Sequence, residues 1–399
     1  MMSDRLYYSD SSRTEFDAVV VEGRRVGDRP AVVLDASAFY PTSGGQPFDT
    51  GTLGEARVIE VVESESGEVL HVLDREIPAG QPVRGQIDWV RRFDHMQQHT
   101  GQHILSAALD KLCDARTVSF HLGAEVSTVD LAIPLSEMEI AAAESEANRV
   151  VWEDRPVRIR FVDEAEAAAL PLRKEPDRAG TLRVIDVDGY DLSACGGTHV
   201  ERSGAIGVIA VLSAERLRGG TRLEFVCGGR ALRSLRRFRE AVAGCIRHVS
   251  VAPEELPAAV ERLQADAKDQ RKLAKGLQER LAGFEAAALA AAAEEVNGRR
   301  QVVQAIEGQD QNGLKAMALA ICSNPGFSVA LLSTASPAVA VVARSRDVTL
   351  DSASVLKALM TEFGGRGGGR PDLAQGGGLT GELGAMLART RELFGKGQA

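Results

Sequence analysis

Two short motifs, far apart in the chain, constrain the fold more than any other feature. His99-Thr-Gly-Gln-His103 offers two imidazoles four residues apart. Cys195-Gly-Gly-Thr-His199 offers a thiolate and a third imidazole at the same spacing. Three nitrogens and one sulfur suit Zn²⁺, which is borderline-soft and usually tetrahedral. If the four side chains share one ion, the fold must bring the two segments together.

The first pair of ligands has an alternative, because His95 lies four residues before His99. Positions four apart on an α-helix lie on one face, about 6 Å apart along the axis. His95 and His103 would be about 12 Å apart, which is too far for one tetrahedral ion. Spacing alone therefore permits either His95 with His99 or His99 with His103. It also permits a purely structural zinc, for which four protein ligands are typical, whereas a catalytic zinc keeps one position open.

Composition places the chain among ordinary soluble proteins. Its 399 residues predict two to four domains, and 44% hydrophobic and 26% charged residues are common values. The apolar runs are too short to cross a bilayer and the N-terminus lacks a hydrophobic signal core, so we expect a cytoplasmic protein with no membrane partner. Five irregularly spaced cysteines do not suggest a disulfide framework. Those other than Cys195 are expected to be small buried hydrophobes.

The pattern of elements predicts an α+β protein with four domains. Short Val-rich segments separated by Gly and Asp predict a small β-barrel in residues 1–87. Mixed helices and strands predict an α/β domain, carrying the zinc site, in residues 88–228. Apolar residues that alternate steps of four and three predict a coiled coil or a long helical hairpin in residues 229–297. Residues 298–399 alternate helix and strand, interrupted by a glycine loop, and predict a C-terminal α/β domain.

Charge bears on possible partners. A net charge of −9 argues against non-specific coating of nucleic acid. Residues 215–239 nevertheless hold eight arginines against two glutamates. This run is the best candidate for phosphate contacts, although a solvated helix face would explain part of it.

The motifs together resemble a known family. The first motif in the chain is FYPTSGGQPFDTG, at residues 39–51. It is followed by HTGQH, CGGTH, RGGTRLEF and GGGRPDLAQGGG, in that order. This ordered set resembles the editing domain of alanyl-tRNA synthetase and its free-standing form, the AlaX family of alanyl-tRNA editing proteins. The long AlaX form also carries the synthetase's C-terminal oligomerisation and tRNA-binding domain.

The resemblance implies a function and a set of ligands. It implies a trans-editing hydrolase that cleaves the aminoacyl ester of mischarged tRNA(Ala), carrying Ser or Gly, at a zinc-dependent site. About 90 residues precede the zinc helix, too few for an adenylate-forming core. Because the family's first pair reads H-T-x-x-H, the zinc ligands are expected to be His99, His103, Cys195 and His199. A homodimer through the C-terminal domain is a further implication.

Substrate and tRNA contacts are expected around this site, while no residue is assigned as the catalytic group. Thr42 and Gln46 of the barrel loop are expected to close over the aminoacyl end. Gln102 stands where the synthetase often has Thr. Strand alternation would place Thr117, Ser119 and His121 on one face, with Ser119 the first choice to read a substrate hydroxyl. Expected tRNA-binding residues are Arg218, Arg222, Arg236, Arg237, Arg366 and Arg370.

Two alternatives remain at this point. A non-enzymatic, zinc-containing tRNA-binding module would keep the metal and the arginines but would not need the FYPTSGGQ loop. A DHH-type phosphoesterase shares the C-terminal glycine-rich domain, but it needs an Asp-His-His run. Asp94-His95-Met96 breaks that run, and a thiolate is ill suited to such a site.

Overall fold

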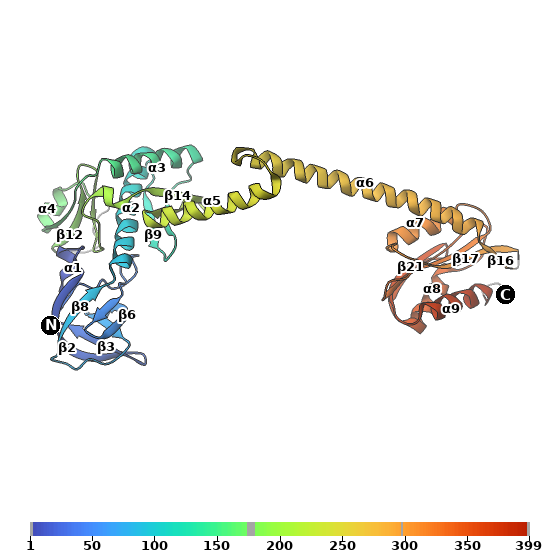
Figure 1. The fold of residues 1–399 in the computed structure, drawn as a ribbon, viewed down its shortest axis with the longest axis horizontal. Helices are drawn as coiled ribbons and strands as arrows, with labels where there is room; N and C mark the ends of the chain where they lie inside the picture. Colours follow the sequence, from blue (N-terminus) through green and yellow to red (C-terminus); the bar gives the residue numbers. More distant parts are fainter. Residues whose placement is uncertain (1–2, 174–179, 297, 397–399) are drawn as a thin grey trace. The chain divides into compact units, whose positions relative to one another are not determined.

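The computed structural model describes residues 3–173, 180–296 and 298–396 (Figure 1). The chain divides into two compact units, Met1–Cys245 and Ile246–Ala399. Both units mix helices and sheets, which confirms the expected α+β class. Among the residues described, no helix is both long enough and apolar enough to cross a bilayer.

A closed six-stranded barrel begins the first unit, in the order β2-β3-β7-β6-β5-β8. Its strands are β2 (Glu15–Val26), β3 (Arg29–Leu34), β5 (Gly51–Leu53), β6 (Ala56–Glu63), β7 (Val69–Leu73) and β8 (Pro82–Ile87). Alternate residues face the interior, as in β8, where buried and exposed positions alternate without a break. The barrel was expected from sequence. Two strands that sequence reasoning did not identify, β5 and β8, close it.

A short N-terminal segment packs beside the barrel. β1 (Asp4–Arg5) pairs in parallel with β4 (Ala36–Ser37), and α1 (Leu6–Ser9) follows β1 directly. Tyr7 of α1 is fully buried, with its ring edge-on to Tyr40 at 5.3 Å. This segment therefore joins the N-terminus to the loop that leads out of β4.

The central helix α2 (Trp89–Cys113) organises the rest of the first unit. Asp88 caps its N-terminus, because its side chain accepts a hydrogen bond from the Arg91 backbone nitrogen. Sixteen of its residues, nearly all between positions 95 and 109, are buried. The helix contacts strands of two separate sheets, and α3 (Glu137–Trp152) packs against it. Segments far apart in sequence thus meet at one helix.

The two sheets that contact α2 differ in size. The larger has the order β14-β15-β10-β9 and the smaller has the order β11-β12-β13. The strands are β9 (Thr117–Leu122), β10 (Ser127–Leu131), β11 (Val157–Val162), β12 (Leu182–Val187), β13 (Asp191–Ala194), β14 (Ile209–Leu217) and β15 (Gly220–Cys227). A short helix, α4 (Glu164–Ala169), follows β11. β13 leads directly into the Cys195–His199 motif, so the smaller sheet places that motif beside α2.

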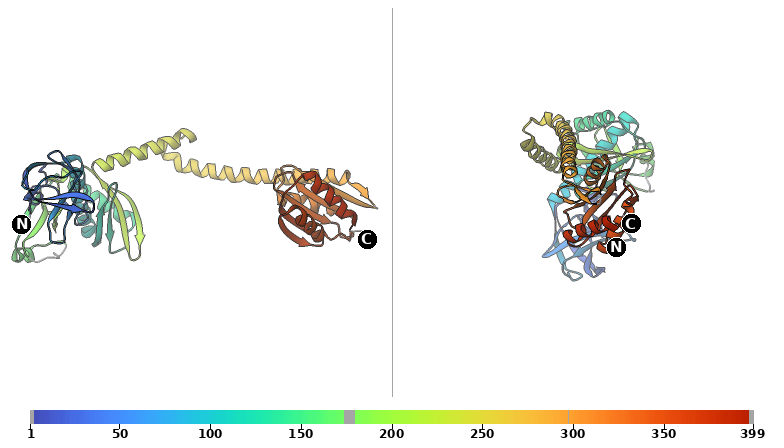
Figure 2. Two further views of the ribbon diagram at one scale, coloured as in Figure 1. Left: turned by 90° about the horizontal axis from the view of Figure 1, so that it is seen from below. Right: turned by 90° about the vertical axis from the view of Figure 1, so that its right-hand side faces the viewer.

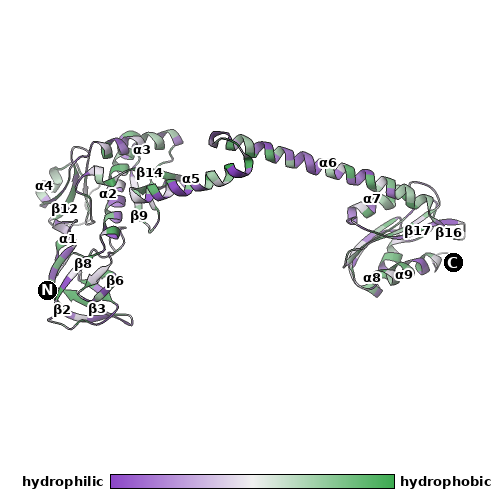
Figure 3. Ribbon diagram, viewed as in Figure 1, coloured by the Kyte–Doolittle hydropathy of each residue, from purple (hydrophilic) through white to green (hydrophobic). Residues whose placement is uncertain are grey.

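Two helices follow the larger sheet. α5 (Gly229–Val249) starts from an ion pair in which the buried Arg230 contacts the half-buried Asp94 of α2 at 2.6 Å. α6 (Leu256–Ala291) carries interleaved hydrophobic and hydrophilic residues along its length (Figure 3). Apolar side chains of both helices are exposed, for example Phe238 on α5 and Leu277 on α6. Their expected pairing as a coiled-coil hairpin stays a prediction.

The second unit is a three-layer α/β/α arrangement (Figures 1 and 2). Its sheet has the order β16-β17-β18-β19-β21-β20. One face packs on α7 and on the last turns of α6, and the other face packs on α8 and α9. The elements are β16 (Glu294–Val296), β17 (Arg299–Ile306), α7 (Gln311–Cys322), β18 (Phe327–Ser333), β19 (Ala338–Arg344), α8 (Ser352–Phe363), β20 (Arg366–Arg370), β21 (Leu373–Leu379) and α9 (Leu383–Lys396).

The expected glycine loop is instead a β-hairpin formed by β20 and β21. The expectation was wrong because glycine is depleted in most strands. Here the two backbones approach closely: a Cβ at Gly367 would lie 2.4 Å from Gly376 Cα. Only glycine permits such an approach. The glycines that suggested a loop are therefore required by this edge hairpin.

The cysteine expectation was right in part. Cys227 is fully buried, but Cys113 and Cys322 are half-buried and Cys245 is exposed. Cys245 lies on α5, whose residues beyond its first turn are mostly solvent-exposed. A cysteine on such a helix has no core to enter.

Candidate metal centre and adjoining pocket

Four side chains converge beside α2. One ligand atom from each of His99, His103, Cys195 and His199 lies within 4.8 Å of the other three. The Sγ of Cys195 lies 3.4 Å from the Nε2 atoms of both His99 and His199. In a tetrahedral zinc site, neighbouring ligand atoms are roughly 3.3–3.8 Å apart, because the bonds are about 2.0–2.3 Å long. The donor set and these two separations therefore fit one zinc ion.

The cluster resolves the choice between the two histidine pairs. His95 is buried on α2 but is not a member of the four-residue group. Since His99 and His103 lie one turn apart, both rings reach the loop that carries Cys195 and His199. The two motifs therefore meet, as expected.

Each histidine of the cluster has a different hydrogen-bond partner for its Nδ1 atom. His99 Nδ1 donates to Gln46 Oε1 at 2.8 Å, and His103 Nδ1 donates to Asp191 Oδ2 at 3.1 Å. His199 Nδ1 lies within hydrogen-bond distance of Thr100 Oγ1, at 3.2 Å. These contacts leave all three Nε2 atoms for the metal, and such partners also orient the rings.

Electrostatics favours the metal-binding protonation state at Cys195 and His199 but not at His103. Burial lowers the pKa of His103, but hydrogen bonds with Asp191 and Cys195 outweigh burial and raise this pKa to about 9. Burial raises the pKa of the Cys195 thiol, but His99 and His199 hold it well below its usual range. Burial also holds the pKa of His199 well below its usual value, so this ring is neutral. For Asp191, burial raises the pKa, but His103 and Arg173 hold it below its usual range. The cluster therefore holds a thiolate, and a charged carboxylate supports His103.

The backbone of the second motif passes very close to His99. A Cβ at Gly197 would lie 2.1 Å from His99 Cε1. No larger residue fits there unless the imidazole moves. The Gly197 backbone nitrogen also donates to Cys195 Sγ at 3.4 Å. Glycine at this position thus lets the Cys195 loop and the helix share one small space.

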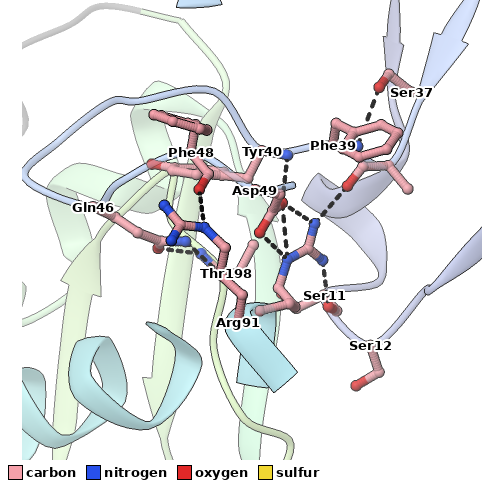
Figure 4. Close-up of polar contacts among 12 residues, drawn as sticks. Ser11, Ser12, Ser37, Phe39, Tyr40, Gln46, Phe48, Asp49, Arg91 and Thr198 are labelled. Carbon is pink, nitrogen blue, oxygen red and sulfur yellow. Dashed lines mark hydrogen bonds and ion pairs between the residues drawn. The ribbon is translucent and has the colours of Figure 1, made fainter. Parts of the chain in front are cut away.

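Gln46 lies behind the metal ligands. Its side chain is fully buried, its Nε2 donates to Thr198 Oγ1 at 2.8 Å, and its Oε1 accepts from the Thr198 backbone nitrogen at 3.1 Å (Figure 4). The barrel loop therefore connects both metal motifs. Thr42 of the same loop is exposed, and neither residue lines the pocket described below. Their expected place over an aminoacyl group stays a prediction, and in this structure the loop turns Gln46 toward His99 and Thr198.

A buried ion pair fixes this loop to α2. Arg92 and Asp49 are both fully buried, and Arg92 Nε lies 3.1 Å from each carboxylate oxygen of Asp49. Asp49 also accepts a hydrogen bond from the Tyr40 backbone nitrogen at 2.7 Å (Figure 4). Arg91 donates to the Phe48 carbonyl at 2.8 Å. Sequence reasoning missed this pair, and no local spacing signals it.

A pocket of about 250 Å³ opens beside His103 and Cys195. Two of the expected substrate residues, Gln102 and Ser119, line it, as does Thr117. Three charged residues that sequence reasoning missed also line it, namely Asp110, Arg116 and Arg173. Arg173 is fixed by Asp191, with Nε 2.7 Å from Oδ1. The pocket combines the exposed edge of the cluster with polar and charged walls.

A β-bulge changes the expected arrangement of strand β9. The register with β10 shifts between Ser119 and Thr117, so alternation is broken at Val118. Thr117 Oγ1 donates to Ser106 on α2, whereas Ser119 Oγ donates to Asp130 on β10. His121 is exposed and does not line the pocket. The three side chains therefore do not share one environment.

Comparison with known proteins places the chain in a family. It is 32% identical over 387 residues to the alanyl-tRNA editing protein AlaX-L of Pyrococcus horikoshii, covering 94% of each chain. The chain belongs to the AlaX family of alanyl-tRNA editing proteins. It is also 37% identical over 396 residues to the alanine–tRNA ligase of Natronomonas pharaonis, covering 94% of this chain and 42% of the ligase.

Three family models match parts of this AlaX chain. They are tRNA synthetases class II (A) at residues 6–91, the threonyl and alanyl tRNA synthetase second additional domain at 182–224, and the DHHA1 domain at 298–396. Cys195 and His199 lie inside the second match. The C-Ala domain of Aquifex aeolicus alanyl-tRNA synthetase aligns with 25% of the chain and 96% of its own length, at 22% identity and a TM-score of 0.24.

The arginines expected to contact tRNA differ in availability. Arg218, Arg236, Arg237, Arg366 and Arg370 are exposed. Arg222 is paired with Asp130, with nitrogen–oxygen distances of 2.7 and 2.8 Å. Its charge is therefore largely satisfied within the β-sheet of this AlaX protein.

Proposed function

We propose that this AlaX protein is a trans-editing hydrolase that removes Ser or Gly from mischarged tRNA(Ala), with zinc held by His99, His103, Cys195 and His199. The observation that carries the proposal is the four-ligand cluster, which borders a pocket of about 250 Å³. A space of this size suits a small aminoacyl group. The similarity to AlaX-L along 94% of the chain supports the same function. Such an enzyme acts where aminoacyl-tRNAs are used, in the cytoplasm.

The proposed reaction answers a problem of selectivity. Alanine lies between glycine and serine in size, so a pocket that admits alanine cannot sterically exclude glycine. A single added hydroxyl is also hard for an apolar pocket to reject. Binding differences of about 1–3 kcal/mol leave too many errors, and a second hydrolytic site removes them.

The residues around the cluster have separable roles in this proposal. When bound, zinc supplies Lewis-acid polarisation of a substrate oxygen or nitrogen. The three imidazoles are oriented by contacts at the histidine Nδ1 atoms, made by Gln46, Thr100 and Asp191. Gln102 and Ser119 line the pocket and would contact the aminoacyl group. Gln46 would thus act through His99 rather than on the substrate.

The remainder of the tRNA would be held by exposed arginines. We assign phosphate contacts to Arg218, Arg236 and Arg237 in the first unit, and to Arg366 and Arg370 on β20. These side chains are exposed, and phosphate contacts dominate nucleic-acid affinity. A homodimer through the domain at residues 298–396 is part of the same proposal.

A deacylation assay tests the function. Purified protein is incubated with tRNA(Ala) carrying Ser, Gly or Ala, and the remaining aminoacyl ester is measured. We expect hydrolysis of the Ser or Gly ester and sparing of the Ala ester. His99→Ala should reduce hydrolysis to the uncatalysed rate and lower the zinc content below one per chain. A wild-type protein that binds the tRNAs and hydrolyses none of them would instead be a zinc-containing tRNA-binding module.

A further inference from the structure

One polar group beside the pocket has no partner within the protein. Gln102 immediately precedes His103 on α2, and its side chain is 3% exposed. Its Oε1 atom is buried without a hydrogen-bond partner among the described residues. An unpaired buried acceptor is energetically unfavourable, and it is rare in folded proteins. Gln102 lines the pocket, so a ligand that enters this space can reach the residue.

The amide of Gln102 is held in one orientation. Its Nε2 donates to Ser106 Oγ at 2.8 Å, one turn further along α2. Thr117 Oγ1 of strand β9 also donates to Ser106 Oγ at 2.8 Å. Ser106 is 1% exposed, so the middle of this chain of hydrogen bonds is buried. Because the nitrogen is committed to Ser106, the oxygen of Gln102 is the free end.

Ser119, the residue first expected to contact a substrate hydroxyl, has its own hydroxyl proton committed to another residue. Ser119 Oγ donates to Asp130 Oδ2 at 2.8 Å, and Asp130 is also paired with Arg222. Ser119 is exposed, whereas Gln102 is buried. A hydrogen bond to a buried acceptor discriminates more strongly than one to an exposed acceptor, because the buried acceptor is poorly hydrated when it is left unpaired.

We propose that Gln102 Oε1 accepts the side-chain hydroxyl of a seryl group, and that this contact makes the pocket selective for a hydroxyl-bearing aminoacyl ester. The proposal rests on the editing function proposed above. An alanyl methyl group would leave Oε1 unpaired, so the alanyl ester would lose this contact. Ser106 is the positioning residue, since it fixes the amide through Nε2.

The experiment compares two esters of nearly equal size on wild-type protein. tRNA(Ala) is charged with serine or with 2-aminobutyrate, in which a methyl group replaces the hydroxyl. We expect kcat/KM to be at least tenfold higher for the seryl ester. Equal rates for the two esters would overturn the proposal without affecting the editing function. Hydrolysis of no ester, including the glycyl ester, would count against the editing function itself.

Variants assign the preference to the residue. Gln102→Met keeps the length of the side chain and removes the acceptor, so the ratio of seryl to aminobutyryl kcat/KM should fall at least tenfold. Ser106→Ala should lower this ratio by a smaller factor. Gln97→Met is the matched control on the same helix, because Gln97 donates to the Ala205 carbonyl and does not line the pocket.

Zinc content and circular dichroism verify that each variant is folded. Gln102→Met with the wild-type ratio, or with equal losses on both esters, would overturn the proposal, because a general structural role lowers both rates alike. If Gln102→Met does not fold, Ser106→Ala and the wild-type comparison decide the matter.

Discussion

At the scale of single residues, the metal cluster depends on close contacts beyond its four ligands. His99 contacts the barrel loop through Gln46 and faces the backbone at Gly197. Small changes at these two positions should alter metal binding without removing a ligand.

Gly197→Ala should displace the His99 ring. The added methyl group would lie 2.1 Å from Cε1, far inside van der Waals contact. We expect zinc affinity to fall at least tenfold in a competition titration with a chromogenic chelator. Gly196→Ala is the matched control, because its nearest contact would be Tyr8 Oη at an ordinary 3.6 Å. Equal affinities in the two variants would contradict the geometry.

Gln46→Leu should leave the Nδ1–H group of His99 buried and unpaired. Loss of such an orienting partner typically lowers metal affinity 10–100-fold. The same titration measures this, with Thr42→Val on the exposed part of the loop as the control. If Gln46 instead contacts the substrate, Gln46→Leu would retain full zinc affinity and lose only activity.

At the scale of elements, the barrel and α2 are joined by the fully buried pair Arg92–Asp49. Arg92→Met would leave the Asp49 carboxylate buried without its cation. We expect the free energy of unfolding to fall by about 3–5 kcal/mol in urea titrations. Arg158→Met, which breaks a surface pair with Asp188, should have a much smaller effect. Equal effects would mean that the buried pair is not a strong link.

The barrel also contains a buried histidine with a lowered pKa. His71 lies on β7, is fully buried, and contacts Ser37 Oγ through Nε2 at 2.7 Å. Burial lowers the pKa of His71 to about 4 from 6.5. Below pH 6.5 the unfolded chain gains a proton that the folded barrel does not take up, so stability declines as the pH falls toward 4.

A non-titrating variant isolates this contribution. The drop in Tm between pH 7 and pH 5 should be smaller for His71→Asn than for the wild type, measured by thermal denaturation at both pH values. His95, whose pKa burial also lowers to about 4, contributes equally to both proteins and cancels in the comparison. An identical drop in the two proteins would refute the assignment.

At the scale of the whole molecule, the proposed function needs a long nucleic acid held by a protein of net charge −9. Local exposed arginines must therefore supply the attraction. Charge reversal at Arg236 and Arg237 should weaken tRNA binding and lower the slope of log affinity against log salt by about 2, since each phosphate contact contributes about 0.9.

The lysine variants at the same two positions are the control. Replacing Arg236 and Arg237 by Lys keeps both charges, so the salt slope should stay at the wild-type value in filter-binding titrations. An unchanged slope in the charge-reversed protein would exclude these arginines from the interface.

Local spacing along the chain is enough to predict several features of this protein. Alternation and turn residues predicted most barrel strands, and helical periodicity predicted α2, because each pattern is set by neighbours in the chain. The spacing within the two metal motifs likewise identified the four candidate ligands.

Other features depend on contacts between distant segments, and the folded structure was needed to find them. It separated His95 from the cluster, turned Gln46 toward His99, and formed the buried pair Arg92–Asp49. It also introduced the bulge that directs Thr117 to Ser106. None of these features follows from local periodicity. Each arises where side chains of the barrel, α2 and two sheets pack against one another.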